Sequence, residues 1–240
     1  MALVVAGVAG CASADEDREP ERRVFGVQGA RLVVDSRDSA LEVVASERVP
    51  EGEVRVTRWF KGSVAVGGEP EVSWRMEGDR LTLRMKCSGV FADCAVKHLV
   101  EVPRGLAVEV EEGDGSVRAR GFRDALSVRT GDGAVHVTDS TGPLRLRSGD
   151  GAVRAEVDAT EVRAQTGDGA LKIEVGVVPR LVEARSGDGS VTVEVPDGAY
   201  RVSADAGDGG VDVDVPRDSS SAHVLRAHAG DGKVTVRTAN

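Results

Sequence analysis

A tripeptide, Gly-Asp-Gly, occurs seven times in the second half of the chain and constrains the fold more than any other feature. Successive copies lie 18, 18, 18, 20, 20 and 23 residues apart. A nearly fixed period of this length is typical of repeat proteins, in which each unit buries its apolar face only against its neighbours. The first glycines of the copies are Gly113, Gly131, Gly149, Gly167, Gly187, Gly207 and Gly230.

Apolar and polar residues alternate on both sides of each tripeptide. Before the third copy, for example, Leu144 and Leu146 alternate with Arg145 and Arg147. This period of two is typical of half-buried β-strands, and no segment shows a helical period. Each unit is therefore predicted to consist of a strand, a Gly-Asp-Gly corner, a second strand and a short connection.

The residue types at each Gly-Asp-Gly corner predict how the chain turns there. The glycines are expected to adopt positive φ, and the aspartate between them is expected to accept hydrogen bonds from nearby backbone N–H groups as an Asx-turn. Ser or Thr directly before the tripeptide can act similarly inside the bend. The predicted turn aspartates are Asp114, Asp132, Asp150, Asp168, Asp188, Asp208 and Asp231.

Two all-β topologies can use such units. In a single-stranded β-solenoid, coils of 18–20 residues stack in parallel, and the crossover rule predicts a right-handed β-helix. In the alternative, an antiparallel β-meander or sandwich, each tripeptide closes a hairpin. One register repeats through all seven copies, so the solenoid is favoured.

The first half of the chain shows the same alternation less regularly. Strands are expected over 31–35, 41–45, 53–59, 72–76, 80–86, 98–102 and 107–111. No linker separates the halves. One β domain is therefore predicted over 24–240, with irregular strands over 24–112 and the repeats over 113–240.

The N-terminus resembles a bacterial lipobox, in which a cysteine after small apolar residues is lipidated. Residues 1–10 are apolar and directly precede Cys11, and the charged segment 11–23 suits a flexible tether. However, no basic residue precedes Cys11, and the apolar stretch is short for a signal peptide. The prediction is a signal-peptide remnant over 1–10 and a lipid on Cys11, which would anchor the chain to a membrane outside the cytoplasm. An unmodified apolar N-terminus is the alternative.

The other two cysteines, Cys87 and Cys94, are close in sequence and form a candidate disulfide in an oxidising compartment. Closing a loop of about eight residues would stabilise the fold by ~2.5 kcal/mol. Two alternatives stay open. The cysteines would be free thiols in the cytoplasm, or they would bind a metal together with His98, at a spacing that matches no familiar zinc site.

Charge and composition limit the partners. The net charge of −9 argues against nucleic acid. Calcium on the turn aspartates would need about six to eight oxygens, more than one carboxylate per coil supplies, so no metal or cofactor is predicted. Outward arginines interleave with glutamates, which favours a salt-bridged surface over an anion-binding one. These arginines are Arg145, Arg147, Arg154, Arg163 and Arg185.

Several segments in a fixed order resemble the bacterial "putative adhesin" or β-strand-repeat family, a domain of unknown function on exported and membrane-tethered proteins. The matching segments are GARLVVDSRDSALEVVASE, EVRVTRW, GDRLTLRMKC, VEVPRGLAVEVEEGDGSV and the RSGDGAV-type repeats. The resemblance implies an extracytoplasmic β-solenoid and an adhesin role, and it supplies no catalytic residue.

The prediction for function is a non-enzymatic envelope lipoprotein at the cell surface. It would present its solenoid for adhesion to, or binding of, an envelope polymer or protein that the sequence does not identify. One alternative is an envelope-stress signalling or structural module. The other is a polysaccharide-acting enzyme on a β-helix scaffold, which would place clustered carboxylates in long loops rather than at periodic positions.

Overall fold

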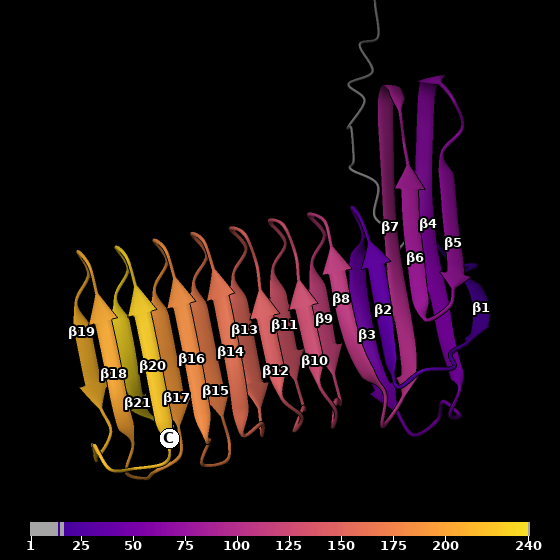
Figure 1. Ribbon diagram of the computed structural model, residues 1–240. Coiled ribbons are helices and arrows are strands. Elements are labelled where there is room, and N and C mark those ends of the chain that lie inside the picture. Colours follow the sequence, from indigo (N-terminus) through magenta and orange to yellow (C-terminus); the bar gives the residue numbers. More distant parts are fainter. Residues whose placement is uncertain (1–13, 15–16, 240) are drawn as a thin grey trace, which may run out of the picture.

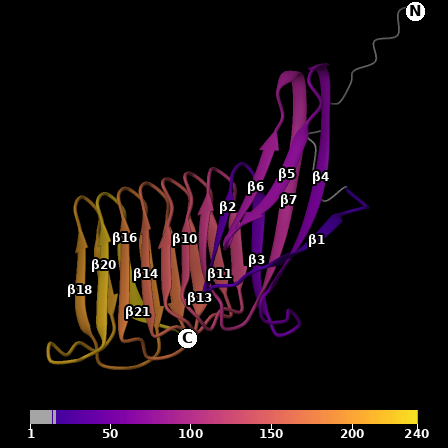
Figure 2. The same ribbon diagram turned by 45° about the vertical axis from the view of Figure 1, so that its right-hand side comes forward.

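The computed structural model describes residue 14 and residues 17–239, and its strands form a β-solenoid with two sheets. The sheets are opposite sides of a flattened coil, with one continuous apolar core between them (Figure 2). In spatial order, sheet A consists of β1 (Glu21–Gly26), β4 (Glu53–Gly67), β7 (Gly89–Pro103), β3 (Ala40–Ser46), β9 (Val117–Arg120), β11 (Val135–Thr138), β13 (Val153–Val157), β15 (Leu171–Val175), β17 (Val191–Val195), β21 (Val234–Thr238) and β19 (Val211–Asp214). Sheet B consists of β18 (Arg201–Ala206), β20 (Val224–Ala229), β16 (Leu181–Ser186), β14 (Glu161–Thr166), β12 (Leu144–Arg147), β10 (Leu126–Arg129), β8 (Ala107–Glu112), β2 (Arg31–Ser36), β6 (Arg80–Lys86) and β5 (Glu71–Glu77).

Each repeat contributes the strand before its tripeptide to sheet B and the strand after it to sheet A (Figure 1). Equivalent strands pair in parallel and in register, as in β12 with β14, where Leu144 lies beside Val162. The predicted solenoid is therefore confirmed, and the antiparallel meander is wrong for the repeats. The right-handed coiling stays a prediction.

In-register stacking lines up the apolar side chains in columns that face the interior. Leu126, Leu144 and Val162 form one such column, and all three are buried. Aromatic residues are only 3% of the chain, so the core is mainly aliphatic and the coils are thin. Burying each such side chain contributes roughly 1.5–3 kcal/mol, so a coil is stable only against its neighbours.

The glycines of the corners have a different role from the one that the sequence suggests. None of the Gly-Asp-Gly glycines adopts positive φ. Instead, neighbouring coils approach so closely that a Cβ on Gly151 would lie 2.1 Å from the Gly133 carbonyl oxygen. The same holds for Gly169, where the distance to the Gly151 oxygen would be 2.3 Å. Glycine is therefore required here by the contact between coils, not by the shape of the turn.

Buried hydroxyl groups, rather than the aspartates, hold the corners together. Ser148 donates to the Gly133 carbonyl at 2.9 Å, and Thr166 donates to the Gly151 carbonyl, also at 2.9 Å. Ser186 makes the equivalent bond to the Gly169 carbonyl at 2.9 Å, and Thr130 donates to the Gly113 carbonyl at 2.8 Å. The expected Asx-turns do not form, since no carboxylate of the seven turn aspartates accepts a hydrogen bond from a described residue.

The first Gly-Asp-Gly corner carries a carboxylate at the hydroxyl position. Glu112 is buried there and accepts a long hydrogen bond, 3.4 Å, from the backbone N–H of Ser39. Burial raises the pKa of Glu112 above its ordinary value. At this corner, the contact with the β2–β3 coil is therefore made by the carboxyl group of Glu112 rather than by a hydroxyl group.

The coils are not stacked in the order of the sequence. The last coil, β20 and β21, lies between β16–β17 and the coil formed by β18 and β19. Consequently β18 and β19 form the end of the stack, and their inward side chains are only half covered, with Val211 47% exposed. At the other end, the β2–β3 coil lies between β6–β7 and β8–β9.

The N-terminal part adds an antiparallel cap. β4 and β7 form a long antiparallel pair that projects beyond the coils (Figure 1). Both strands extend well past the segments 53–59 and 98–102 expected from the sequence. β1 begins at Glu21, and the Asp17 carboxylate accepts a hydrogen bond from the Phe60 backbone N–H at 3.0 Å. The folded domain thus begins before residue 24. Cys11 and the segment 1–10 lie outside the described residues.

A disulfide joins Cys87, which follows β6, to Cys94 on β7, and their Cα atoms are 6.2 Å apart. We predict that the double variant Cys87→Ser/Cys94→Ser loses about 2.5 kcal/mol of unfolding free energy, because the unfolded chain regains the freedom of the loop. Urea titration with and without a thiol reductant measures this. The reductant should destabilise the native chain and leave the variant unchanged. Equal sensitivity of the two proteins would contradict the assignment.

Candidate functional site

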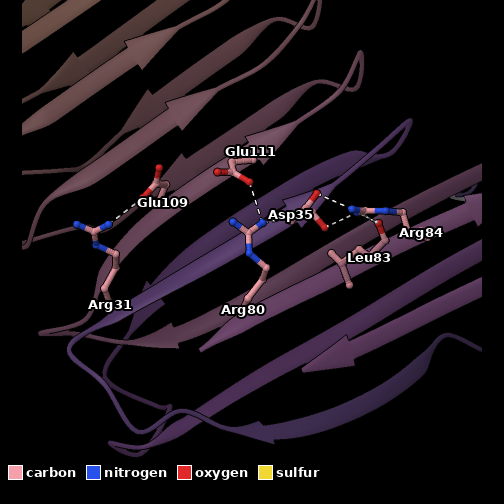
Figure 3. Close-up of polar contacts among 7 residues, drawn as sticks. All are labelled: Arg31, Asp35, Arg80, Leu83, Arg84, Glu109 and Glu111. Atoms are coloured by element: carbon pink, nitrogen blue, oxygen red, sulfur yellow. Dashed lines mark hydrogen bonds and ion pairs between the residues drawn. The ribbon is translucent and has the colours of Figure 1, made fainter. Parts of the chain in front are cut away.

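The outer face of sheet B carries an ion-pair network where β2, β6 and β8 meet (Figure 3). Arg80 lies 3.0 Å from Asp35 and 2.8 Å from Glu111, and Arg84 lies 2.8 Å from Asp35 on its other side. Burial favours a higher pKa for Asp35, but the hydrogen bonds and charges of Arg84 and Arg80 outweigh it and lower the pKa. Each carboxylate in this part of the face thus has a basic partner.

The pattern changes beyond β8, where the outward positions become arginines without carboxylates between them. Arg129, Arg145 and Arg147 are exposed, and none of them makes a hydrogen bond or ion pair with a described residue. Arg129 lies beside Arg147, and Arg145 lies beside Arg163 on the next strand. Neighbouring strands are about 4.8 Å apart, so these like charges are close.

Further along the sheet, β14 and β16 supply partners again. Arg163 contacts both Glu161 and Glu183, and Arg185 contacts Glu183 at 2.5 Å. We call the outward set on these strands the arginine face, which consists of Arg129, Arg145, Arg147, Arg163 and Arg185. Two open grooves of about 440 and 240 Å³ cross it, and Arg145 and Arg163 line both.

On the outer face of sheet A, basic side chains pair with acidic ones. Arg154 pairs with Glu156, and Glu194 lies 3.3 Å from Lys172 and accepts a hydrogen bond from Arg237 at 2.9 Å. Burial favours a higher pKa for Glu194, but hydrogen bonds from Arg237 and Lys172 outweigh it and lower the pKa. The sequence prediction of a salt-bridged surface therefore holds on this face.

The five outward arginines expected from the sequence do not share one surface. Arg154 follows its corner and lies on sheet A, whereas the other four precede their corners and lie on sheet B. For Arg145 and Arg147 the salt-bridged interpretation is wrong, because no carboxylate reaches them within the described chain.

The antiparallel cap buries two basic side chains, Arg58 and His98. Arg58 on β4 pairs with Glu21 at 2.9 Å, and its guanidinium carbon lies 4.4 Å from the ring centre of Trp74. His98 is the register partner of Arg58 on β7 and is 1% exposed, and neither ring nitrogen has a hydrogen-bond partner. Burial, together with the Arg58 charge, lowers the pKa of His98 to about 4.

The structure offers no set of ligands for either metal site considered from the sequence, the Cys87–Cys94–His98 site or calcium on the turn aspartates, within the described residues. Cys87 and Cys94 use their sulfur atoms in the disulfide, so they do not form a site with His98. The turn aspartates are all exposed along one edge of the coils. Among the described residues, no three His, Cys, Asp or Glu side chains group closely enough to hold a metal ion.

The described part of the chain also contains no helix that is long and apolar enough to cross a membrane. Comparison with curated proteins finds no match.

Three crystal structures resemble the chain at low identity. A protein of Parabacteroides merdae described as a putative adhesin is 14% identical, with a TM-score of 0.47, over 91% of this chain and 96% of that one. A putative adhesin of Bacteroides fragilis is 12% identical, with a TM-score of 0.44, over 92% and 98%. A putative cell adhesion protein of Clostridium sporogenes is 12% identical, with a TM-score of 0.39, over 92% and 100%.

A family model described as Toastrack DUF4097 matches residues 81–240. The match begins inside β6 and includes every Gly-Asp-Gly coil, so it covers well over half of the chain. It supports the resemblance to a family of unknown function that the sequence motifs suggest. The chain belongs to the Toastrack DUF4097 family.

Proposed function

We propose that this chain is a non-enzymatic adhesion protein of the bacterial cell envelope, anchored outside the cytoplasm through a lipid on Cys11. The observation that carries the proposal is the arginine face, an exposed surface on a stacked β-scaffold. Three of its arginines, Arg129, Arg145 and Arg147, have no ion-pair partner within the described chain. A regular sheet surface offers many similar contacts along its length, which suits attachment to an extended polymer.

Two features support an extracytoplasmic location. The residues before Cys11 resemble a lipobox, and the charged segment after it would place the solenoid away from the membrane. The Cys87–Cys94 disulfide is of the kind that persists in oxidising compartments.

The grooves on sheet B favour binding over glycoside hydrolysis. Hydrolysis requires two carboxylates free to act as acid and as base or nucleophile. The two carboxylates that line the larger groove are Glu109, held by Arg31 at 3.1 Å, and Glu161, held by Arg163 and Arg180. Both carboxylates are thus occupied by arginine partners rather than free to act as acid or nucleophile.

Lipid attachment is tested by growing the producing cells with labelled palmitate. The native chain should take up label, and the Cys11→Ser variant should not. Equal labelling of the two proteins, or none of either, would contradict the anchor.

Adhesion is tested separately with the full-length Cys11→Ser chain, so that the lipid cannot contribute. The protein is mixed with detergent-washed envelope fragments of the producing cell and centrifuged. We expect it to sediment with the fragments and to stay in solution without them. A protein that stays in the supernatant would overturn the proposed function.

A further inference from the structure

The arginine face is unusual because the same fold neutralises its charges elsewhere. On sheet A, the strands that carry Arg154 and Lys172 also carry Glu156 and Glu174 two positions later, and each base pairs with a carboxylate. The strand geometry of sheet B is equivalent, so glutamates could stand beside Arg145 and Arg147 in the same way. They do not, although the chain as a whole carries a net charge of −9.

The residues of the arginine face lie in two rows that run across the strands, and only Arg163 and Arg185 among its arginines have glutamate partners within the described chain. One row contains Ser127, Arg145 and Arg163, and the other contains Arg129, Arg147, Gln165 and Arg185. Because the strands are in register, neighbouring members of a row are about 4.8 Å apart. The two grooves meet at Arg145 and Arg163, so they join the face from Arg31 to Arg185 into one path along the solenoid.

Guanidinium groups in such an array are well suited to binding carboxylates. Arginine donates two parallel hydrogen bonds to a carboxylate, and adjacent like charges are relieved when anions lie between them. A linear ligand with carboxylates at regular intervals would meet a new arginine at each strand. The rows therefore suit a polymer lying along the solenoid better than a single small anion.

We propose that the arginine face binds an extended acidic polysaccharide, whose carboxylates pair with Arg129, Arg145 and Arg147. This inference rests on the proposed adhesion function and names its ligand class. Nucleic acid fits the face less well. The strands β10, β12, β14 and β16 contain no aromatic residue on which bases could stack.

The experiment measures binding of polygalacturonate, a carboxylate-bearing polysaccharide, to the full-length Cys11→Ser chain. The test variant also carries Arg129→Gln, Arg145→Gln and Arg147→Gln. The matched control carries Arg118→Gln, Arg120→Gln and Arg154→Gln instead, which removes the same charge from exposed positions on sheet A. Thermal melting checks that both variants stay folded, as expected for exposed side chains.

We expect the native face to bind polygalacturonate, with affinity that falls as salt is added, and not to bind neutral dextran. The test variant should bind about tenfold more weakly or worse, because three exposed ion pairs are lost. The control should bind within about twofold of the parent.

Three results would overturn the proposal: no binding of polygalacturonate by the parent, equal losses in the two variants, or equally tight binding of single-stranded oligothymidine. The outcome is separable from that of the adhesion experiment. If the parent sediments with envelopes and the Arg129/Arg145/Arg147 variant sediments equally well, adhesion stands and this ligand assignment fails. If the parent does not sediment, adhesion itself fails.

Discussion

Replacing Gly151 with alanine is expected to lower the free energy of unfolding by about 3 kcal/mol or more. The new Cβ would lie 2.1 Å from the Gly133 carbonyl oxygen and 2.4 Å from its carbonyl carbon. Both contacts are with backbone atoms, so no side chain can rotate away to make room. The Gly133 coil would have to move, and it is held in register on both sides by parallel strands.

The matched control for this variant is Gly210→Ala. Gly210 directly follows the Gly207–Gly209 corner, but no heavy atom lies within 4 Å of the position that its Cβ would take, and its φ is not positive. We expect a change of less than about 0.5 kcal/mol there. Urea titrations of the two variants and the native chain give the comparison. Similar midpoints for both variants would show that close contact between coils is not what requires glycine.

The local structure of the repeats was predictable from the sequence because strand formation depends on neighbouring residues. The alternation around Leu144 and Leu146 has period two wherever the chain goes next, and both residues are buried as expected. The role of the glycines was not predictable in the same way. Positive φ and close approach both select glycine, and only the distance to the next coil distinguishes them.

The order of the coils depends on non-local pairing, which the sequence does not show. The last two coils both carry alanine at the hydroxyl position, Ala206 and Ala229, so their inward columns look alike. The structure places the β20–β21 coil inside, and β18 and β19 are consequently the more exposed strands. The longest repeat spacing, 23 residues, coincides with the return of the chain from the end coil to the β20–β21 coil.

The candidate site was only partly predictable for a related reason. The alternation correctly places Arg145, Arg154 and Arg163 on the outside, but it does not say which carboxylate of the adjacent coil lies beside each one. Pairing across strands decides that Arg163 lies beside Glu183 and that Arg145 lies beside Arg163. The burial of His98 could have been predicted from the sequence but was missed. His98 lies on the same side of its strand as Val96 and Val100, which are both buried.

His98 is expected to make the protein sensitive to acid. It faces the interior between Arg58 on β4 and Leu41 on β3, with no carboxylate at either register position. Burial and the Arg58 charge lower its pKa from an ordinary value of 6.5 to about 4. Between these two values the unfolded chain binds a proton that the folded chain excludes. The free energy of unfolding therefore falls as the pH falls, by about 3 kcal/mol in total.

About 2 kcal/mol of this loss should occur between pH 6.5 and pH 5. In that range the carboxylates with lowered pKa values, Asp35 and Glu194, stay ionised and contribute little change. Protonation of Glu112, whose pKa is raised, would act in the opposite direction, because a buried acid favours the neutral form. A loss of stability in this range can therefore be assigned to His98.

The variant His98→Leu tests the assignment, because leucine does not titrate and forfeits no hydrogen bond that His98 makes. Unfolding free energies are measured by urea titration at pH 7, 6 and 5. The native chain and a His228→Gln control, changed at an exposed histidine that pairs with Asp205, should both lose stability. The His98→Leu profile should be nearly flat over the same range, since the buried imidazole without a hydrogen-bond partner has been removed. An equally steep profile in that variant would mean that another group titrates, and the interior of the cap would not be the acid-sensitive element.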